Sequence, residues 1–142
     1  MALYSLSLAS TVTGSAAPSW DCKPSTNESK IMEVGVVNGA ATACTYGYGR
    51  SANNPTQTSG VALLDEQGGG GVAVATCAVA WSTAPTVPTQ FYRRVYLAAT
   101  IGVGYIYSIP KGILMQTATA SFVQWNIAAS SALVSVHVVS DE

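Results

Sequence analysis

Apolar and polar residues alternate with a period of two along much of the chain. In the segment KIMEVGVV, Met32, Val34 and Val36 occupy one face, and Glu33 and Gly35 occupy the other. This period is typical of a β-strand with one buried face. Two later segments repeat it, with predicted buried residues Val123, Trp125 and Ile127 opposite exposed Gln124 and Asn126, and with Val134, Val136 and Val138.

Turn signals separate these segments. Asn38-Gly39 suits a tight turn, a run of glycines spans 68–71, and prolines stand at 85, 88 and 110. About eight to ten short strands result, with no helical segments between them to connect parallel strands. The sequence therefore predicts an all-β protein: a single-domain antiparallel jelly-roll sandwich with an extended N-terminal arm.

The predicted arm and its linker cover residues 1–19, and the sandwich covers residues 20–142. Ser, Thr, Gly and Pro are frequent in residues 10–19, as in a linker. A signal peptide is disfavoured because the start has neither a basic region nor an unbroken apolar run. We expect the arm to add as a strand to a neighbour's sheet or groove. Its apolar stripe comprises Leu3, Tyr4, Leu6 and Leu8.

Charge is scarce in this chain. Only 9% of the 142 residues are charged and the net charge is -1, against roughly 25% charged residues in ordinary domains. A surface with so little charge is expected to be covered by partners, including copies of the chain itself. The six Lys and Arg residues form no basic face, so nucleic acid is not an expected partner. No apolar run is long enough for a membrane span.

Few groups could perform acid–base chemistry. His137, the one histidine, lies on the same strand face as Ser135. To act as a base it would need a carboxylate that orients the ring, and Asp141 is predicted to lie on the same face of the strand. Asp65 and Glu66 are adjacent and are predicted to lie in a solvated turn. A single histidine cannot supply a metal-ligand cluster. The sequence therefore predicts no enzyme, no cofactor, no metal and no small-molecule ligand.

The three cysteines, Cys22, Cys44 and Cys77, form no C-x-x-C motif. An odd number in a chain of this length is not typical of a disulfide framework. We expect small buried thiols and folding in a reducing cytoplasm, in a particle that could later leave the cell.

The segment TACTYGYGR resembles a glycine-rich phosphate loop in composition, but no helix is predicted after it. At strand period, Gly47 and Gly49 share one face and Tyr46 and Tyr48 share the other, while Arg50 ends the strand. We therefore interpret the segment as a strand that packs against another subunit.

Arg93 and Arg94 are adjacent, so on a strand their side chains point to opposite sides. One hypothesis is a salt bridge to a carboxylate of the same chain, and the other is an intersubunit pair. Tyr and Arg are enriched at interfaces. The predicted subunit interface comprises Tyr46, Tyr48, Arg50, Tyr92, Arg93, Arg94 and Tyr96.

Five segments carry a family resemblance: WDCK, KIMEVGVV, TYGYGRSANNP, FYRRVYLAATIGVGYIYSIPKGILM and SFVQWNIAASSALVSVHVVSDE. Together they resemble small β proteins that tailed phages encode as capsid decoration (cement) proteins, over most of residues 20–142. The resemblance implies a jelly-roll or tumour-necrosis-factor-like sandwich, often trimeric, on the outside of the head at threefold or quasi-threefold positions. It also implies no catalytic residues.

The partners implied are the chain itself, as a homotrimer, and a major capsid protein whose neighbouring subunits it clamps. The chain would be made in the host cytoplasm and would lie on the outer capsid surface. A carbohydrate- or receptor-binding jelly roll is the alternative. Its aromatic platforms would be Trp81, Trp125, Tyr46 or Tyr48, although Trp125 shares an apolar face with its neighbours and so favours the core.

Overall fold

A computed structural model describes residues 2–12, 16–69, 71–116, 120–128 and 132–142. All regular structure in these residues is β-strand, which confirms the predicted all-β class. The strands are β1 (Leu3–Val12), β2 (Ala17–Pro24), β3 (Ser29–Asn38), β4 (Cys44–Arg50), β5 (Thr56–Gln57), β6 (Val61–Ala62), β7 (Leu64–Asp65), β8 (Ala75–Ala78), β9 (Trp81–Thr83), β10 (Arg93–Leu97), β11 (Gly104–Met115), β12 (Phe122–Asn126) and β13 (Ala132–Asp141).

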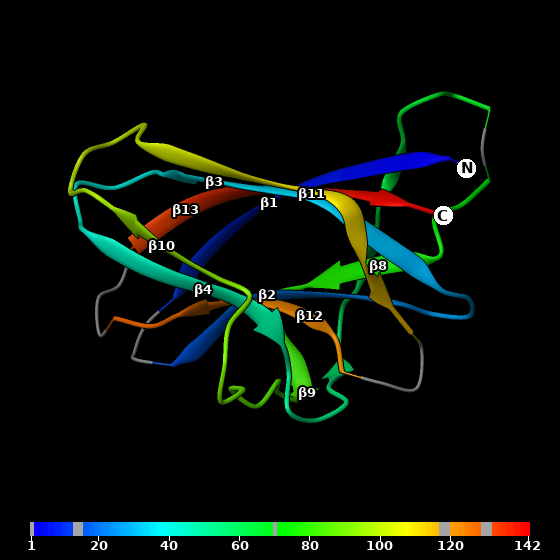
Figure 1. The fold of residues 1–142 in the computed structure, drawn as a ribbon, viewed down its shortest axis with the longest axis horizontal. Helices are drawn as coiled ribbons and strands as arrows, with labels where there is room; N and C mark the ends of the chain where they lie inside the picture. Colours follow the sequence, from blue (N-terminus) through cyan, green and yellow to red (C-terminus); the bar gives the residue numbers. More distant parts are fainter. Residues whose placement is uncertain (1, 13–15, 70, 117–119, 129–131) are drawn as a thin grey trace.

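Two antiparallel sheets pack face to face (Figure 1). The first sheet has the order β11-β3-β13-β1-β7, and the second has the order β10-β4-β12-β2-β8-β6. If the short strands β6, β7 and β8 are set aside, each sheet has four strands. Successive strands then alternate between the two sheets, from β1 to β4 and again from β10 to β13. This order is that of two interleaved Greek keys, so the predicted jelly-roll sandwich is confirmed.

The connection between β4 and β10 supplies the additional strands. Within it, β7 extends the first sheet beside β1, while β8 and β6 extend the second sheet beside β2. The short strands β5 and β9 pair with each other.

The main core fills the space between the sheets. Valines 134, 136 and 138 are buried there, as the alternation predicts. An aromatic cluster joins three strands of the second sheet: the Phe122 ring stacks on Tyr48 with centroids 6.2 Å apart and lies 6.0 Å from the ring of Trp20. Large rings from neighbouring strands thus provide much of the buried volume.

Residues 3–12 are a strand of the first sheet, which corrects the predicted N-terminal arm. Strand β1 pairs with β13 from Leu3–Asp141 to Val12–Ala132, and with β7 on its other side. Tyr4 is buried, and Leu6 and Leu8 pack against the core. A period-two stripe shows that one face is covered, but it does not show whether the covering sheet belongs to the same chain.

Strand β12, in the interior of the second sheet, is buried on both faces. Gln124 and Asn126, predicted to be exposed, are buried, as are Val123 and Trp125 on the opposite face. The expected exposure was wrong because the alternation in this strand separates two covered faces rather than a covered and a solvated one.

The predicted burial of Met32 on the face of Val34 and Val36 is also wrong. Ile31 is fully buried, whereas Met32 is only partly buried, because β3 has an extra residue between Ile31 and Glu33 in its pairing with β13. Such a β-bulge shifts the inward-facing side by one residue. Val34 and Val36 face inward as predicted.

Cys22 and Cys77 form a disulfide between β2 and β8, so the expectation of free thiols was wrong for these two residues. They stand directly opposite each other in the strand register, with Cα atoms 4.1 Å apart. Cys44 is a free, buried thiol, as expected. The odd cysteine count therefore reflects one bridge and one free residue.

Candidate functional site

Strand β10 lies at the edge of the second sheet and exposes an aromatic and basic surface. Tyr92, just before the strand, is 50% exposed and Tyr96 is 74% exposed; Arg93 and Arg94 are exposed as well. We call these four residues the basic edge. In the register with β4, Arg93 lies opposite Tyr48 and Arg94 opposite Gly47, so the two guanidinium groups leave opposite faces of the sheet as predicted.

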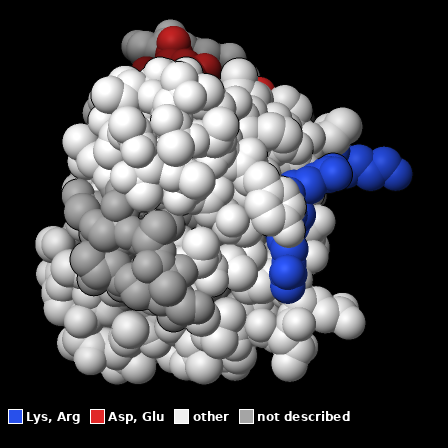
Figure 2. Space-filling view, turned by 90° about the vertical axis from the view of Figure 1, so that its left-hand side faces the viewer, with Lys and Arg blue, Asp and Glu red and all other residues white. Residues whose placement is uncertain are grey.

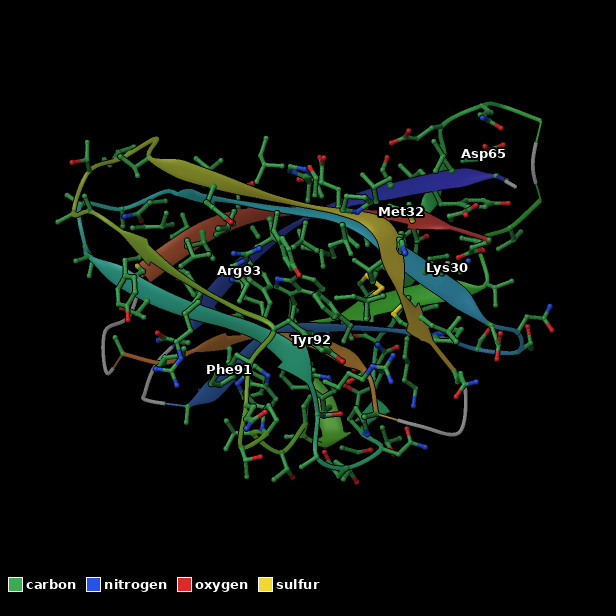
Figure 3. The ribbon with its side chains drawn as sticks, viewed as in Figure 1. Lys30, Met32, Asp65, Phe91, Tyr92 and Arg93 are labelled. Carbon is green, nitrogen blue, oxygen red and sulfur yellow. A yellow bond between two sulfur atoms is a disulfide. The ribbon has the colours of Figure 1, made fainter. Side chains whose placement is uncertain are left out.

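Aromatic rings lie under both guanidinium groups. Arg93 lies 5.1 Å from the ring centroid of Tyr107 on β11, and Arg94 lies 5.3 Å from that of Phe91. Figure 3 shows Phe91, Tyr92 and Arg93 on the same side of the sandwich. Cation–π contacts of this kind restrict the guanidinium groups without neutralising their charge.

The one ion pair within the described residues joins His137 and Glu33. Neither Arg93 nor Arg94 therefore has a carboxylate partner among the described residues, which disfavours the hypothesis of a salt bridge within the chain. The intersubunit hypothesis stays a prediction.

The other members of the predicted interface do not join the basic edge. Tyr46 and Tyr48 are 1% and 0% exposed and point into the core, so their assignment to an interface was wrong. Burial raises the pKa of both phenols above its ordinary value. Arg50 is partly buried, and its Nη2 donates to the carbonyl oxygen of Leu114, which ties the second sheet to β11.

Gly47 and Gly49 do share a face that a close neighbour covers, but the neighbour is the chain itself. A Cβ at Gly47 would lie 2.7 Å from Phe91 Cδ1 and 2.8 Å from Ile127 Cδ1, and one at Gly49 would lie 3.4 Å from Pro88 Cγ. The segment before β10 therefore packs on the glycine face and holds Phe91 beneath Arg94.

A polar cluster occupies the outer face of the first sheet. His137 Nε2 lies 3.0 Å from Glu33 Oε1, and the Ser108 hydroxyl donates to Glu33 Oε2 over 2.9 Å. These two hydrogen bonds lower the pKa of the Glu33 carboxyl. Glu33 is thus the carboxylate that His137 requires, whereas Asp141 pairs in register with Leu3 and Lys30.

Sequence reasoning missed Glu33 as the partner because it compared positions along one strand only. Both residues are predicted to face away from the valines, so aligning β3 with β13 would have brought them together.

An open cavity of about 440 Å³ next to the pair is lined by Gly35, Val36, Val37, Gly104, Tyr105, Ile106 and His137. Because Ser108 binds the carboxylate rather than the imidazole, this geometry does not activate its hydroxyl as a nucleophile.

Asp21 is a buried carboxylate on the outer face of the second sheet. Its Oδ1 accepts hydrogen bonds from Trp81 Nε1 over 2.7 Å and from Gln57 Nε2 over 3.0 Å. Burial raises the pKa of the Asp21 carboxyl, and the hydrogen bonds partly oppose this effect. The contacts fasten β5 and β9 to β2, which indicates a structural role.

Asp65 and Glu66 lie at the opposite edge of the first sheet from β11. Asp65 ends β7, where Oδ1 accepts a hydrogen bond from the Gln67 amide, and the Glu66 amide donates to the Leu3 carbonyl. Leu64 beside them is 70% exposed. We call Leu64, Asp65 and Glu66 the acidic edge.

Two described loops meet at one end of the sandwich, residues 38–43 and 98–103, and neither contains a charged residue. Their composition is dominated by Ala, Gly and Thr. Figure 2 shows this end almost free of Lys, Arg, Asp and Glu, with basic side chains confined to one side. Ile101 is 67% exposed there. We call this surface the uncharged end.

Within the described ranges, no three His, Cys, Asp or Glu residues are grouped so that they could hold a metal ion. The same residues include no helix that is long and apolar enough to cross a membrane.

No protein-family model matches the chain, and no curated protein matches it. Among solved structures, the chain is similar to the coat protein of tobacco streak virus, with a TM-score of 0.36 and 10% sequence identity, over 98% of this chain and 87% of that one. The jelly-roll assignment follows from the strand order of the two sheets.

Proposed function

We propose that the chain is a structural virion protein that decorates and stabilises a phage capsid by clamping neighbouring major capsid subunits, as a trimer at threefold or quasi-threefold positions. The observation that carries the proposal is the basic edge, an exposed row of Tyr and Arg residues with no acidic partner among the described residues. Such residues dominate the binding energy of protein interfaces. The sequence resemblance to decoration proteins and the jelly-roll fold agree with this role.

Contact with the capsid is assigned to the uncharged end. An uncharged surface can be buried without removing water from ions, which makes a broad contact less costly. The stripe of Leu3, Tyr4, Leu6 and Leu8 packs within this chain's own sheet, so it no longer supports a capsid-contact arm. A trimer that contacts several capsid subunits at once gains avidity from individually weak contacts.

The role proposed is structural rather than catalytic, on the outer capsid surface after synthesis in the host cytoplasm. The Cys22–Cys77 disulfide agrees with a protein that works outside the reducing cell, because such bridges persist in oxidising surroundings.

Co-sedimentation with capsids that lack the protein tests the proposal. Purified chain is mixed with capsids assembled from the major capsid protein of the same genome and then centrifuged. We expect saturable co-pelleting and a higher melting temperature of the capsid. Ile101→Asp should weaken pelleting because it places a charge at the uncharged end, and the matched variant Val87→Asp, also at an exposed position, should not. Wild-type chain that stays in the supernatant at saturating concentration would refute the role.

A carbohydrate-binding role has less support. Trp125, Tyr46 and Tyr48 are buried and offer no stacking platform. Trp81 is partly exposed, but its ring nitrogen already donates to Asp21. Binding on a glycan array that Trp81→Ala abolishes would favour this second function.

A further inference from the structure

Within the described residues, the two main sheets end in four edge strands, and β10 differs from the other three. Strands β6 and β7 comprise only two residues each. Strand β11 is long, but Pro110 has no backbone N–H and the register with β3 shifts between Ser108 and Ile113. Short length, proline and irregular register are features that keep an edge from pairing with a further strand.

Strand β10 has none of these features. Its five residues include no proline or glycine and pair with β4 in unbroken register, from Arg93 to Leu97. Among the described strands, β4 is its one neighbour in the sheet (Figure 1). Alternate N–H and C=O groups of an edge strand point away from its neighbour. Strand β10 therefore offers backbone donors and acceptors to one more strand.

The two arginines of β10 restrict which strand can be added. Both are exposed and lie over aromatic rings, and neither has a carboxylate partner within the described ranges. A second copy of β10 added around a twofold axis would bring guanidinium groups of the two copies close together, and like charges across strands are destabilising. An added strand with carboxylates at these positions would form ion pairs instead.

The spacing of those carboxylates follows from the strand geometry. The side chains of Arg93 and Arg94 leave opposite faces of the sheet. Residues directly opposite each other in neighbouring strands project to the same face. Carboxylates that face both arginines must therefore belong to two consecutive residues of the added strand. Tyr96, which is 74% exposed, lies on the face of Arg94 and can pack against a further apolar side chain of that strand.

We propose that β10 accepts an extended acidic segment of a partner protein as an additional antiparallel strand, with two consecutive Asp or Glu residues paired to Arg93 and Arg94. Backbone hydrogen bonds then supply affinity and the arginines supply specificity. The inference deepens the proposed function and rests on it for the identity of the partner, a neighbouring capsid subunit. The loop of residues 98–103 in the uncharged end follows β10 directly, so the two surfaces are continuous along the chain.

Peptide binding tests the added strand. The probe is a fluorescently labelled peptide of alternating Thr and Val with a central Asp-Asp pair, and fluorescence anisotropy measures its binding to the full chain. We expect saturable binding that weakens as salt is added. Arg93→Gln with Arg94→Gln should raise the dissociation constant about 10-fold. The matched control, Lys30→Gln with Lys111→Gln on β3 and β11, removes the same charge and should leave binding unchanged.

Two control peptides of equal net charge separate strand addition from simple charge attraction. In the first, one Thr stands between the two Asp residues, so both carboxylates project to the same face. In the second, N-methyl groups replace alternate backbone N–H donors. Each should bind about 10-fold more weakly than the probe. Equal binding of either control peptide, equal effects of the two Gln pairs, or no binding of the probe at low ionic strength would overturn the inference.

Co-sedimentation with capsids distinguishes this inference from the proposed function. If the chain pellets with capsids but does not bind the probe, the added strand is wrong and the proposed function stands. If the chain binds the probe as predicted but never pellets, the proposed function is the part that fails, and the acidic segment belongs to a different partner protein.

Discussion

The imidazole of His137 lies directly over Gly35. A Cβ built at residue 35 would stand 2.0 Å from His137 Cε1 and 2.4 Å from Nδ1, so only glycine leaves room for the ring in this position. The two residues are opposite each other in the register of β13 with β3, and Glu33 lies two residues before the glycine. The glycine thus allows the ring to lie flat and reach the carboxylate.

Gly35→Ala should therefore displace the imidazole and break its contact with Glu33. The ring lies at the end of a side chain on an open face and can rotate away, so we expect a loss of only about 1 kcal/mol of unfolding free energy. Urea denaturation measures it. The control is the same change in a His137→Ala background, where Gly35→Ala should not lower the unfolding free energy further. If the loss there is as large as in the wild type, the strain lies in the backbone and not in the contact with the ring.

Glu33 should make stability depend on acid pH. Hydrogen bonds from His137 and Ser108 lower its folded-state pKa, so its stabilising contribution is complete above the unfolded value near 4.5 and is lost as the pH falls through the folded pKa. Glu33→Gln should flatten this part of the profile of unfolding free energy against pH. An identical slope in the variant would show that other carboxylates, Asp21 among them, account for the acid sensitivity.

The glycine face of β4 allows a matched pair of substitutions. Gly47→Ala would press on Phe91 and Ile127 at under 3 Å and should cost about 1–3 kcal/mol. Gly49→Ala meets its nearest neighbour at 3.4 Å and should change the unfolding free energy by less than about 0.5 kcal/mol. Thermal denaturation of both variants measures the difference. Equal costs would indicate that Phe91 does not pack on Gly47.

The disulfide should be a major source of stability. It joins residues 55 apart in the sequence, and the chain-entropy model gives about 4 kcal/mol for a loop of this length. Cys22→Ser with Cys77→Ser should lower the unfolding free energy by about 2–4 kcal/mol, and reductant should destabilise the wild type but not this variant. Thiol titration of the unfolded wild type should find one reactive thiol, from Cys44, before reduction. Three thiols would contradict the bridge.

Much of the fold was predictable because strand period and turn residues are local properties. The alternation in KIMEVGVV and SALVSVHVV predicted buried valines, and the structure buries Val34, Val36, Val134, Val136 and Val138. The errors arose where a distant segment decides what covers a face. Gln124 was predicted to be exposed, but it lies opposite Tyr48 on the face of β12 that meets the first sheet, and the sequence does not show which face that is.

The site was predictable only in part for the same reason. Because Arg93 and Arg94 are adjacent on a strand, their side chains are predicted to point to opposite faces, and the structure confirms this. The placement of Tyr46 and Tyr48 depends on which face of β4 meets the first sheet, and either face fits the alternation. Pairings between strands, such as Glu33 with His137 and Cys22 with Cys77, require a register that one sequence does not specify.

The most direct test of the central claim is the position of the chain on the particle. Immunogold labelling of purified phage particles, imaged by electron microscopy, locates the chain without assuming any contact residue. Our account predicts label distributed over the head, absent from particles of a deletion mutant whose heads are also less heat-stable. Label confined to the tail, or particles that contain no copy of the chain, would contradict it.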